Sequence, residues 1–135
     1  MKITLSSIIV DHQDKALAFY RDTLGFVVKD DQAMGPPGAP RWITLASPQA
    51  LEGTRISLEP NHYAFVRTYQ AALKENGVPL TAFAVDDIDS EHERLTGLGV
   101  AFKSPPSAGG GGMPRMATFD DTVGNWIMIY EEPKG

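Results

Sequence analysis

The sequence nearly repeats itself after about 74 residues. Leu24-Gly25 returns as Leu98-Gly99, and Pro40-Arg41 returns as Pro114-Arg115, each Pro-Arg pair following a loop rich in Gly and Pro. Solenoids need three or more stacked units, so two long copies do not predict one. They predict two equivalent supersecondary modules, and we expect function where the modules meet.

Composition narrows the class of protein. The chain has 135 residues, the size of one domain, and a net charge of −5 with no cluster of Lys and Arg. That charge argues against nucleic acid and against an anionic membrane surface as partners. No apolar stretch approaches the ~20 residues that span a bilayer, and the start lacks the apolar region of a signal peptide, so we expect a cytoplasmic protein. Cysteine is absent, which excludes disulfides and thiolate metal sites.

The first copy contains one helix and four strands by its hydrophobic pattern. Asp11 is the expected N-cap of the helix, with Asp14 at the third position, and Gly25 is the expected residue after its end. A loop dense in Gly and Pro, which cannot lie inside a sheet, follows at 31–40. Strands are expected at 3–10, 26–28, 41–47 and 54–59.

The second copy shows the same order of elements. Its helix is capped by Asp86 or Asp87, carries Ile88, Leu95 and Leu98 inward, and ends at Gly99. Strands are expected at 80–85, 100–103, 115–120 and 125–131. Between the copies, a connector helix is predicted to begin at Asn61, to carry Phe65, Tyr69, Ala72 and Leu73, and to end at Gly77.

Each copy therefore reads as β-α-β-β-β. A helix covers only one face of a four-stranded sheet, so two such modules are expected to pair. The predicted fold is α+β, with two βαβββ modules forming a curved eight-stranded half-barrel sheet and the helices outside. We expect a single domain over 1–135, with module one at 1–60, the connector helix at 61–78 and module two at 79–135.

Three segments carry a family resemblance over almost the whole length. With them the chain resembles the vicinal oxygen chelate superfamily, which contains glyoxalases, bleomycin-resistance proteins and extradiol dioxygenases. The resemblance implies the paired-module fold and a homodimer. The segments are Ala18-Phe19-Tyr20-Arg21-Asp22 with Leu24-Gly25-Phe26, Phe83-Ala84-Val85-Asp86-Asp87-Ile88-Asp89, and Phe119-Asp120-Asp121-Thr122-Val123-Gly124-Asn125 leading into Ile127-Met128-Ile129-Tyr130-Glu131.

The resemblance also implies where a metal would be held. Enzymes of this superfamily typically bind one divalent metal through His and Glu side chains of four strands, leaving sites open for a substrate with two adjacent oxygens. Carried onto this chain, the four positions fall on Leu5, Ser57, Leu80 and Met128. Leucine has no donor atom and methionine offers only a soft thioether, so we expect no metal. A shift of two residues along one strand face would supply Glu59 alone.

The three histidines do not fall on inward strand positions. His12 follows the first strand, His62 opens the connector helix and His92 lies on the second-module helix. Without an i, i+4 pairing, we expect structural or solvated roles for them rather than metal ligation.

Strand alternation predicts a ligand cavity between the modules. Trp42 or Arg41, and Met116 or Arg115, enter it according to strand register. Such a concave, mostly apolar surface with a few polar anchors is typical of small-molecule pockets, although side chains of small barrels often fill the interior. The candidate cavity residues are Ser7, Trp42, Arg55, Ser57, Glu59, Met116, Trp126, Met128 and Tyr130, on a face that also carries Ile9, Ala82 and Ala84.

Two features of this region have alternative interpretations. Arg55 and Glu59 either pair with each other as a rim salt bridge, or Arg55 anchors an anionic substrate group while Glu59 acts as a base. The loop with four glycines, Gly109 to Gly112, is either a lid over the cavity or an ordinary hairpin loop, and the loop at 34–40 has the same two interpretations.

The sequence favours a metal-free protein that binds a small aromatic or amphipathic molecule. One alternative is a divalent-metal-dependent lyase, isomerase or dioxygenase with an atypical ligand set that includes Glu59. A second alternative is a structural or regulatory domain with a vestigial cavity. The sequence names neither the ligand nor a reaction.

Overall fold

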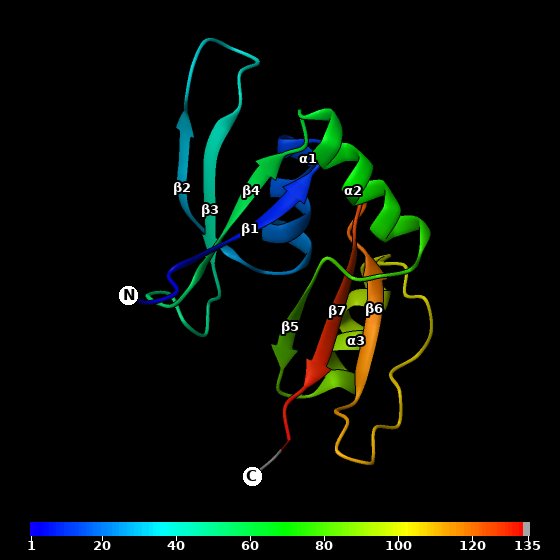
Figure 1. The fold of residues 1–135 in the computed structure, drawn as a ribbon. Helices are drawn as coiled ribbons and strands as arrows, with labels where there is room; N and C mark the ends of the chain where they lie inside the picture. Colours follow the sequence, from blue (N-terminus) through cyan, green and yellow to red (C-terminus); the bar gives the residue numbers. More distant parts are fainter. Residues whose placement is uncertain (134–135) are drawn as a thin grey trace. The chain divides into compact units, whose positions relative to one another are not determined.

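The computed structural model describes residues 1–133. By its contacts the chain divides into two compact units, Met1–Thr68 and Tyr69–Gly135, and the boundary falls inside helix α2. Both units are built from strands and helices, so the predicted α+β class is confirmed (Figure 1). No helix within residues 1–133 is long and apolar enough to span a membrane.

The first unit is a four-stranded sheet covered on one face by a helix. The strand order is β1-β4-β3-β2, with β1 and β4 parallel and the other pairs antiparallel. The elements are β1 (Leu5–Val10), α1 (Gln13–Ala18), a π-helical turn η1 (Phe19–Thr23), β2 (Val27–Ala33), β3 (Arg41–Ala46), β4 (Arg55–Pro60) and the first part of α2 (Ala64–Glu75).

The core of this unit comes from every second residue of β1 and β3, with one residue of β4 and the helical segment. These side chains and those of the helical segment are almost fully buried, and Tyr20 is the largest of them. Burying a large apolar side chain contributes roughly 1.5–3 kcal/mol, so this layer fixes which sheet face meets the helix. The core residues are Ile8, Val10, Ala16, Leu17, Tyr20, Ile43, Leu45 and Leu58.

The α1 helix begins one residue later than the sequence suggests. His12 is the N-cap, because its backbone is extended and its Nδ1 accepts a hydrogen bond from the Lys15 N–H at 3.1 Å. The prediction that Asp11 is the N-cap of this helix is therefore wrong. Gly25 has φ +91°, a conformation that favours glycine, so the predicted helix end is confirmed.

Gln13 of α1 ends the pairing of β3 with β4. Its amide donates to the carbonyl oxygens of Arg41 at 2.8 Å and of Leu58 at 2.9 Å, and its oxygen accepts from the Arg41 N–H at 2.9 Å. One side chain thus satisfies three backbone groups that a continued ladder would have paired. It also fixes α1 to the end of the sheet where Trp42 and Glu59 lie.

The second unit repeats this topology with fewer strands. Its sheet has the order β5-β7-β6, with β5 and β7 parallel and β6 and β7 antiparallel, which matches β1-β4-β3 of the first unit. Its elements are the rest of α2, β5 (Thr81–Val85), α3 (Ile88–Gly97), β6 (Met116–Asp120) and β7 (Trp126–Glu131).

The strand predicted at 100–103 does not form. Phe102 makes one isolated bridge to Phe119, supported by backbone hydrogen bonds from Lys103 N–H to the Thr118 oxygen and from Asp120 N–H to the Ala101 oxygen. The segment lies between Gly99, with φ +89°, and the Pro-containing loop, which leaves too few residues for a ladder. It runs along β6 in the place that β2 takes beside β3.

Two predictions for the helices were also wrong. Helix α2 starts at Ala64 rather than being capped by Asn61, and its buried residue is Gln70. Phe65 and Tyr69 are 72% and 54% exposed. Leu98, expected inward, is exposed after the end of α3. The direction that α2 faces is set by the hydrogen bonds of Gln70 to Val123 and Asn125, and not by its aromatic side chains.

The cap of α3 predicts a pH dependence. Asp87 accepts a hydrogen bond from the Ser90 N–H at 3.1 Å, and this bond lowers the pKa of Asp87. A carboxyl group whose pKa is lower in the folded state stabilises the fold above its unfolded pKa, and that contribution is lost as pH falls through the folded value.

We therefore expect Asp87→Asn, which keeps an acceptor at the cap, to lose less stability than the wild type when the pH falls from about 5 to about 2. Urea unfolding at a series of pH values measures this. Asp87→Ala removes the cap itself and should be less stable than Asp87→Asn at neutral pH. An acid slope of Asp87→Asn equal to that of the wild type would contradict the prediction.

Candidate functional site

The sheet face opposite α1 in the first unit carries a chain of hydroxyl and carboxyl groups. Ser7 and Ser57 are partners in the β1–β4 register, and their Oγ atoms are 3.2 Å apart. The Ser57 hydroxyl donates to Glu59 Oε1 at 2.9 Å. Ser7 is exposed, Ser57 is 1% exposed and Glu59 is half-buried, so the buried Ser57 hydroxyl links an exposed serine to an accessible carboxylate.

A second polar group lies on the same face beside this chain. Asp30 accepts a hydrogen bond from Thr44 Oγ1 at 2.6 Å and pairs with Arg55 at 3.2 Å, both through Oδ2. Neither Asp30 nor Thr44 was among the candidate residues predicted from the sequence. A β-bulge between Val28 and Asp30 shifts the alternation of β2, so counting residues from the expected strand at 26–28 could not place Asp30 on this face.

The predicted salt bridge between Arg55 and Glu59 is wrong. Arg55 pairs with Asp30, and Glu59 accepts from Ser57. Arg55 and Glu59 are four residues apart on β4, so they share a face but their Cα atoms lie about 13 Å apart along the strand. Asp30 on the far side of β3 is therefore the partner within reach of the guanidinium.

Of the two candidates on β3, Trp42 lies on this face and Arg41 does not. Thr44 pairs with Ser57, so Trp42 falls one step further toward the same end of the sheet as Glu59. Arg41 instead bridges to Asp14 and Asp31 on the helix side, and Asp31 first, then Asp14, raises the pKa of Arg41. Ile9 is the β1 register partner of Glu59, which places an aliphatic residue on its other flank.

The second unit presents a less polar face of the same kind. Tyr130 is the register partner of both Met116 and Ala84, and Met128 is the partner of Ala82. Arg115 does not belong to this face, because its guanidinium makes two hydrogen bonds to Asp89, at 2.8 and 2.9 Å. Met116 is therefore the residue that enters from β6. That both faces line one cavity stays a prediction.

Trp126, predicted as a cavity residue, is engaged by α2. Its indole N–H donates to the carbonyl oxygen of Lys74 at 3.0 Å, and the Lys74 ammonium lies 4.0 Å from the ring centroid. The same ammonium pairs with Asp120 at 2.8 Å. A cation over an indole ring is attractive, so these contacts hold the second half of α2 on the sheet.

The positions that the family resemblance assigns to a metal do not fit a divalent cation. Leu5 is on the exposed side of β1, Leu80 precedes β5, and Met128 carries only a thioether. Ser57 supplies a hydroxyl that is already engaged by Ser7 and Glu59. Within residues 1–133, no group of three or more His, Asp or Glu side chains is arranged to hold a metal. This donor chemistry is poor for Mg, Mn, Fe(II) or Zn.

Each histidine makes a contact within the fold. His12 caps α1, the ring of His62 lies 4.3 Å from that of Tyr63, and the ring of His92 lies 4.4 Å from that of Phe102. They lie on separate elements, as expected from the sequence.

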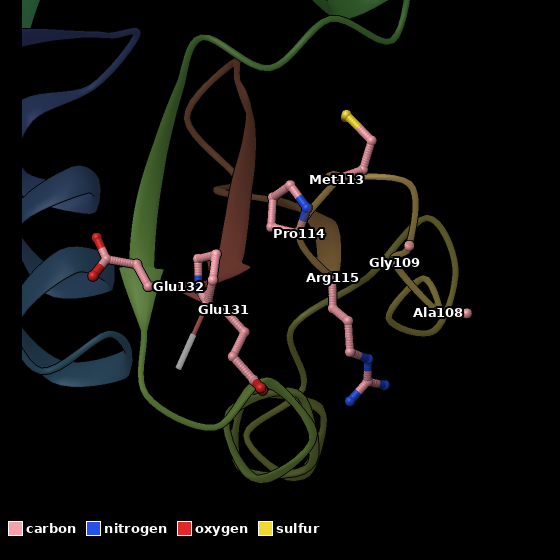
Figure 2. Close-up of a pocket in the computed structure, with 9 residues that line it drawn as sticks. Ala108, Gly109, Met113, Pro114, Arg115, Glu131 and Glu132 are labelled. Carbon is pink, nitrogen blue, oxygen red and sulfur yellow. The ribbon is translucent and has the colours of Figure 1, made fainter. Parts of the chain in front are cut away.

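A hollow of about 310 Å³ lies elsewhere, between the Gly-rich loop and the end of β7 (Figure 2). Two of its three charged side chains, those of Arg115 and Glu131, make contacts within the fold. Glu131 accepts from the Ile88 N–H at 2.9 Å at the start of α3, and Arg115 is paired with Asp89. Gly110 and Met113 exchange two backbone hydrogen bonds, so the loop has the structure of a hairpin. A role for it as a lid stays a prediction.

Comparison with known proteins places the chain in a family. Residues 2–129 match the family model described as the Glyoxalase/Bleomycin resistance protein/Dioxygenase superfamily. The uncharacterized protein YurT of Bacillus subtilis (strain 168) is 44% identical over 132 residues, which cover 98% of this chain and 100% of YurT.

Solved structures agree with this match. The crystal structure of UcmS2 has a TM-score of 0.80 and 24% identity over 96% of this chain and 97% of UcmS2, a likeness in fold. TnmS3, described as an antibiotic binding protein from Streptomyces sp. CB03234, has a TM-score of 0.72 and 28% identity over 98% of this chain and 97% of TnmS3. With its two β-α-β units and the match over nearly its whole length, the chain belongs to the glyoxalase/bleomycin resistance protein/dioxygenase superfamily.

Proposed function

We propose that this chain binds a small aromatic or amphipathic molecule on its open sheet faces and does so without a divalent metal. The observation that carries the proposal is the residue set at the four metal positions of the resemblance, Leu5, Ser57, Leu80 and Met128. Three of them cannot ligate a hard cation, and the fourth is part of a hydroxyl chain that ends at Glu59. Similarity to TnmS3 supports binding rather than catalysis.

The faces have the composition of a ligand site. Trp42 in the first unit, and Met116, Met128 and Tyr130 in the second, provide apolar and aromatic surface, and Glu59 provides a polar anchor. Small-molecule sites are generally lined by apolar and aromatic side chains with a few placed polar groups. Binding is thus expected to depend on these side chains and not on a bound ion.

Metal analysis combined with ligand-induced stabilisation tests the proposal. We expect protein purified without chelator to contain well below one equivalent of Mn, Fe, Ni or Zn per chain, and excess EDTA to leave its melting temperature unchanged. A screen of aromatic antibiotics and quinones should yield compounds that raise this temperature by several degrees, since a ligand at 100 times its Kd stabilises by about 2.7 kcal/mol.

A stoichiometric metal that EDTA removes with a loss of stability would overturn the metal-free proposal and favour the enzyme alternative with Glu59 as a ligand. A screen without any stabilising compound would favour a vestigial cavity. The homodimer and the cytoplasmic location implied earlier stay predictions, and light scattering of the purified protein measures the first of them.

A further inference from the structure

The charged groups on the open face of the first unit do not cancel. Of Asp30, Arg55 and Glu59, the first two form an ion pair at 3.2 Å. Glu59 receives one hydrogen bond on Oε1 from Ser57 and has no cationic partner among the residues of Met1–Thr68. The face therefore keeps one negative charge, on a half-buried carboxylate.

The hydroxyl chain orients this carboxylate. A carboxylate only accepts, so the Ser57 hydroxyl donates to Glu59 Oε1, and the Ser57 oxygen also lies within hydrogen-bond distance of Ser7 Oγ. Ser57 is 1% exposed and cannot turn away to water. Because Oε1 is held from the interior, Oε2 is the oxygen left to meet a group that arrives from the open side.

Apart from Ser57, the groups around Glu59 on this face are apolar. Ile9 is its register partner on β1, and Trp42 lies on the same sheet face, two residues beyond Thr44 on β3, where β3 is no longer paired with β4. An indole attracts cations through its ring face. A carboxylate beside an aliphatic side chain, on a face that also carries an indole, suits a ligand that carries a cationic or strongly donating nitrogen on an apolar body.

Anionic ligands are disfavoured by the same arrangement. Arg55, the guanidinium of this face, is engaged by Asp30, so its charge is already compensated. An anion would approach Glu59 without a free cation on this face to offset the repulsion. The net charge of the whole chain, −5, acts in the same direction.

From this geometry we propose that the ligands of this site are organic ammonium compounds with an aromatic or alicyclic body, and that Glu59 receives their N–H donors while Trp42 packs against the body. This proposal rests on the binding function proposed above and names its ligand class. Glu59 is here a binding group and not a base.

Three probes of one shape test it: 2-(1-naphthyl)ethylamine, 2-(1-naphthyl)ethanol and 3-(1-naphthyl)propionate. Titration by isothermal calorimetry at neutral pH should give a Kd for the ammonium probe at least about tenfold lower than for the alcohol, and weakest binding for the carboxylate. In Glu59→Gln, which preserves shape and a hydrogen-bond acceptor, the ammonium and the alcohol should bind within about twofold of each other.

Glu52→Gln is the matched control, because Glu52 is a strongly exposed carboxylate in the turn between β3 and β4 that pairs with Lys29. It should keep the tenfold preference. Trp42→Leu should weaken all three probes together while leaving their order unchanged.

Three outcomes would contradict the ligand class. Equal binding of the ammonium and alcohol probes, or a preference that survives in Glu59→Gln, overturns the role of Glu59 but leaves the binding function standing. No binding of any probe up to millimolar concentration overturns both proposals.

Discussion

Replacing Asp121 by Ala is expected to lower the free energy of unfolding by about 3 kcal/mol. Each hydrogen bond to a buried charged group contributes roughly 1.5–3 kcal/mol, and buried donors that lose their acceptor add a further cost. Asp121 is fully buried in the turn between β6 and β7. Its Oδ1 accepts from the N–H groups of Val123 at 3.0 Å and Asn125 at 2.9 Å, and its Oδ2 accepts from Asn125 Nδ2 at 2.7 Å.

Asp121→Asn separates the parts of this effect. Its side-chain oxygen can still accept from the two backbone N–H groups, but its amide would face the amide of Asn125, a donor against a donor. Rotation of the Asn125 amide is opposed because Asn125 Oδ1 accepts from Gln70 Nε2 at 3.0 Å. We therefore expect Asp121→Asn to lie between the wild type and Asp121→Ala.

Urea unfolding followed by circular dichroism measures the series, with Asp22→Ala as the control, an exposed carboxylate paired with the adjacent Arg21. The control should keep the wild-type midpoint. A loss below about 1 kcal/mol for Asp121→Ala, the size of an average substitution, would show that water or a rearranged turn replaces the carboxylate.

The second large effect is expected for Gly124→Ala, at about 2–4 kcal/mol, because strained backbone and overpacking each cost roughly 1–3 kcal/mol. Gly124 has φ +103°, and a Cβ built there would lie 2.6 Å from Gln70 Nε2 and 2.9 Å from its Cδ. Gln70 is buried and donates to the Val123 oxygen at 3.2 Å. It cannot move without leaving polar groups of the turn unpaired.

Two glycines serve as controls for the two causes. Gly25 has φ +91° with open space at its Cβ position, so Gly25→Ala measures the cost of the backbone conformation alone. Gly97 lies in α3 with open space and no positive φ, so Gly97→Ala should be neutral or stabilising by up to about 1 kcal/mol. The expected order of destabilisation is Gly124→Ala, then Gly25→Ala, then Gly97→Ala.

The double variant Gln70→Ala/Gly124→Ala tests the close contact itself. If the clash contributes, the two substitutions should be less destabilising together than the sum of the single effects. Additive effects, or a Gly25→Ala variant as unstable as Gly124→Ala, would leave only the backbone conformation as the cause.

The repeat in the sequence predicted that the two units are equivalent, because matching Leu-Gly and Pro-Arg pairs mark corresponding helix ends and strand starts. The equal strand orders β1-β4-β3 and β5-β7-β6 agree with this equivalence, although the sequence did not predict the order itself. Helix ends were predictable where one residue type is required, as at Gly25, Gly77 and Gly99, all with positive φ. Helix starts were harder to predict. The adjacent residues Asp11 and His12 both offer a hydrogen-bond acceptor, and only the backbone conformation makes His12 the N-cap of α1.

The parts of the site that depend on strand alternation could be counted from the sequence. Ser7, Ser57 and Glu59 share a face as predicted, and register selects Trp42 and Met116. Side-chain partners across strands could not be counted in this way. Asp30 reaches Arg55 only through a bulge, which a periodic pattern does not reveal.

Helix α2 shows the limit of hydrophobic patterns. An amphipathic interpretation turns Phe65 and Tyr69 inward, yet the structure buries Gln70. In the turn around Asp121, the carbonyl oxygen of Val123 and the side-chain oxygen of Asn125 need a hydrogen-bond donor. The side-chain amide of Gln70 supplies it, and an aromatic ring could not. The polar requirement of a distant turn therefore decides which side of this helix is buried.

The ion pair between Asp30 and Arg55 makes the charge selectivity of the first sheet easy to change in evolution. The guanidinium is neutralised by a single carboxylate, and Asp and Asn codons differ by one base. An Asn at position 30 would keep an acceptor for Thr44 but release the positive charge of Arg55 toward the ligand. One nucleotide change would thus turn the net negative charge of this face into a balance between Arg55 and Glu59, with the same strands, core and turns.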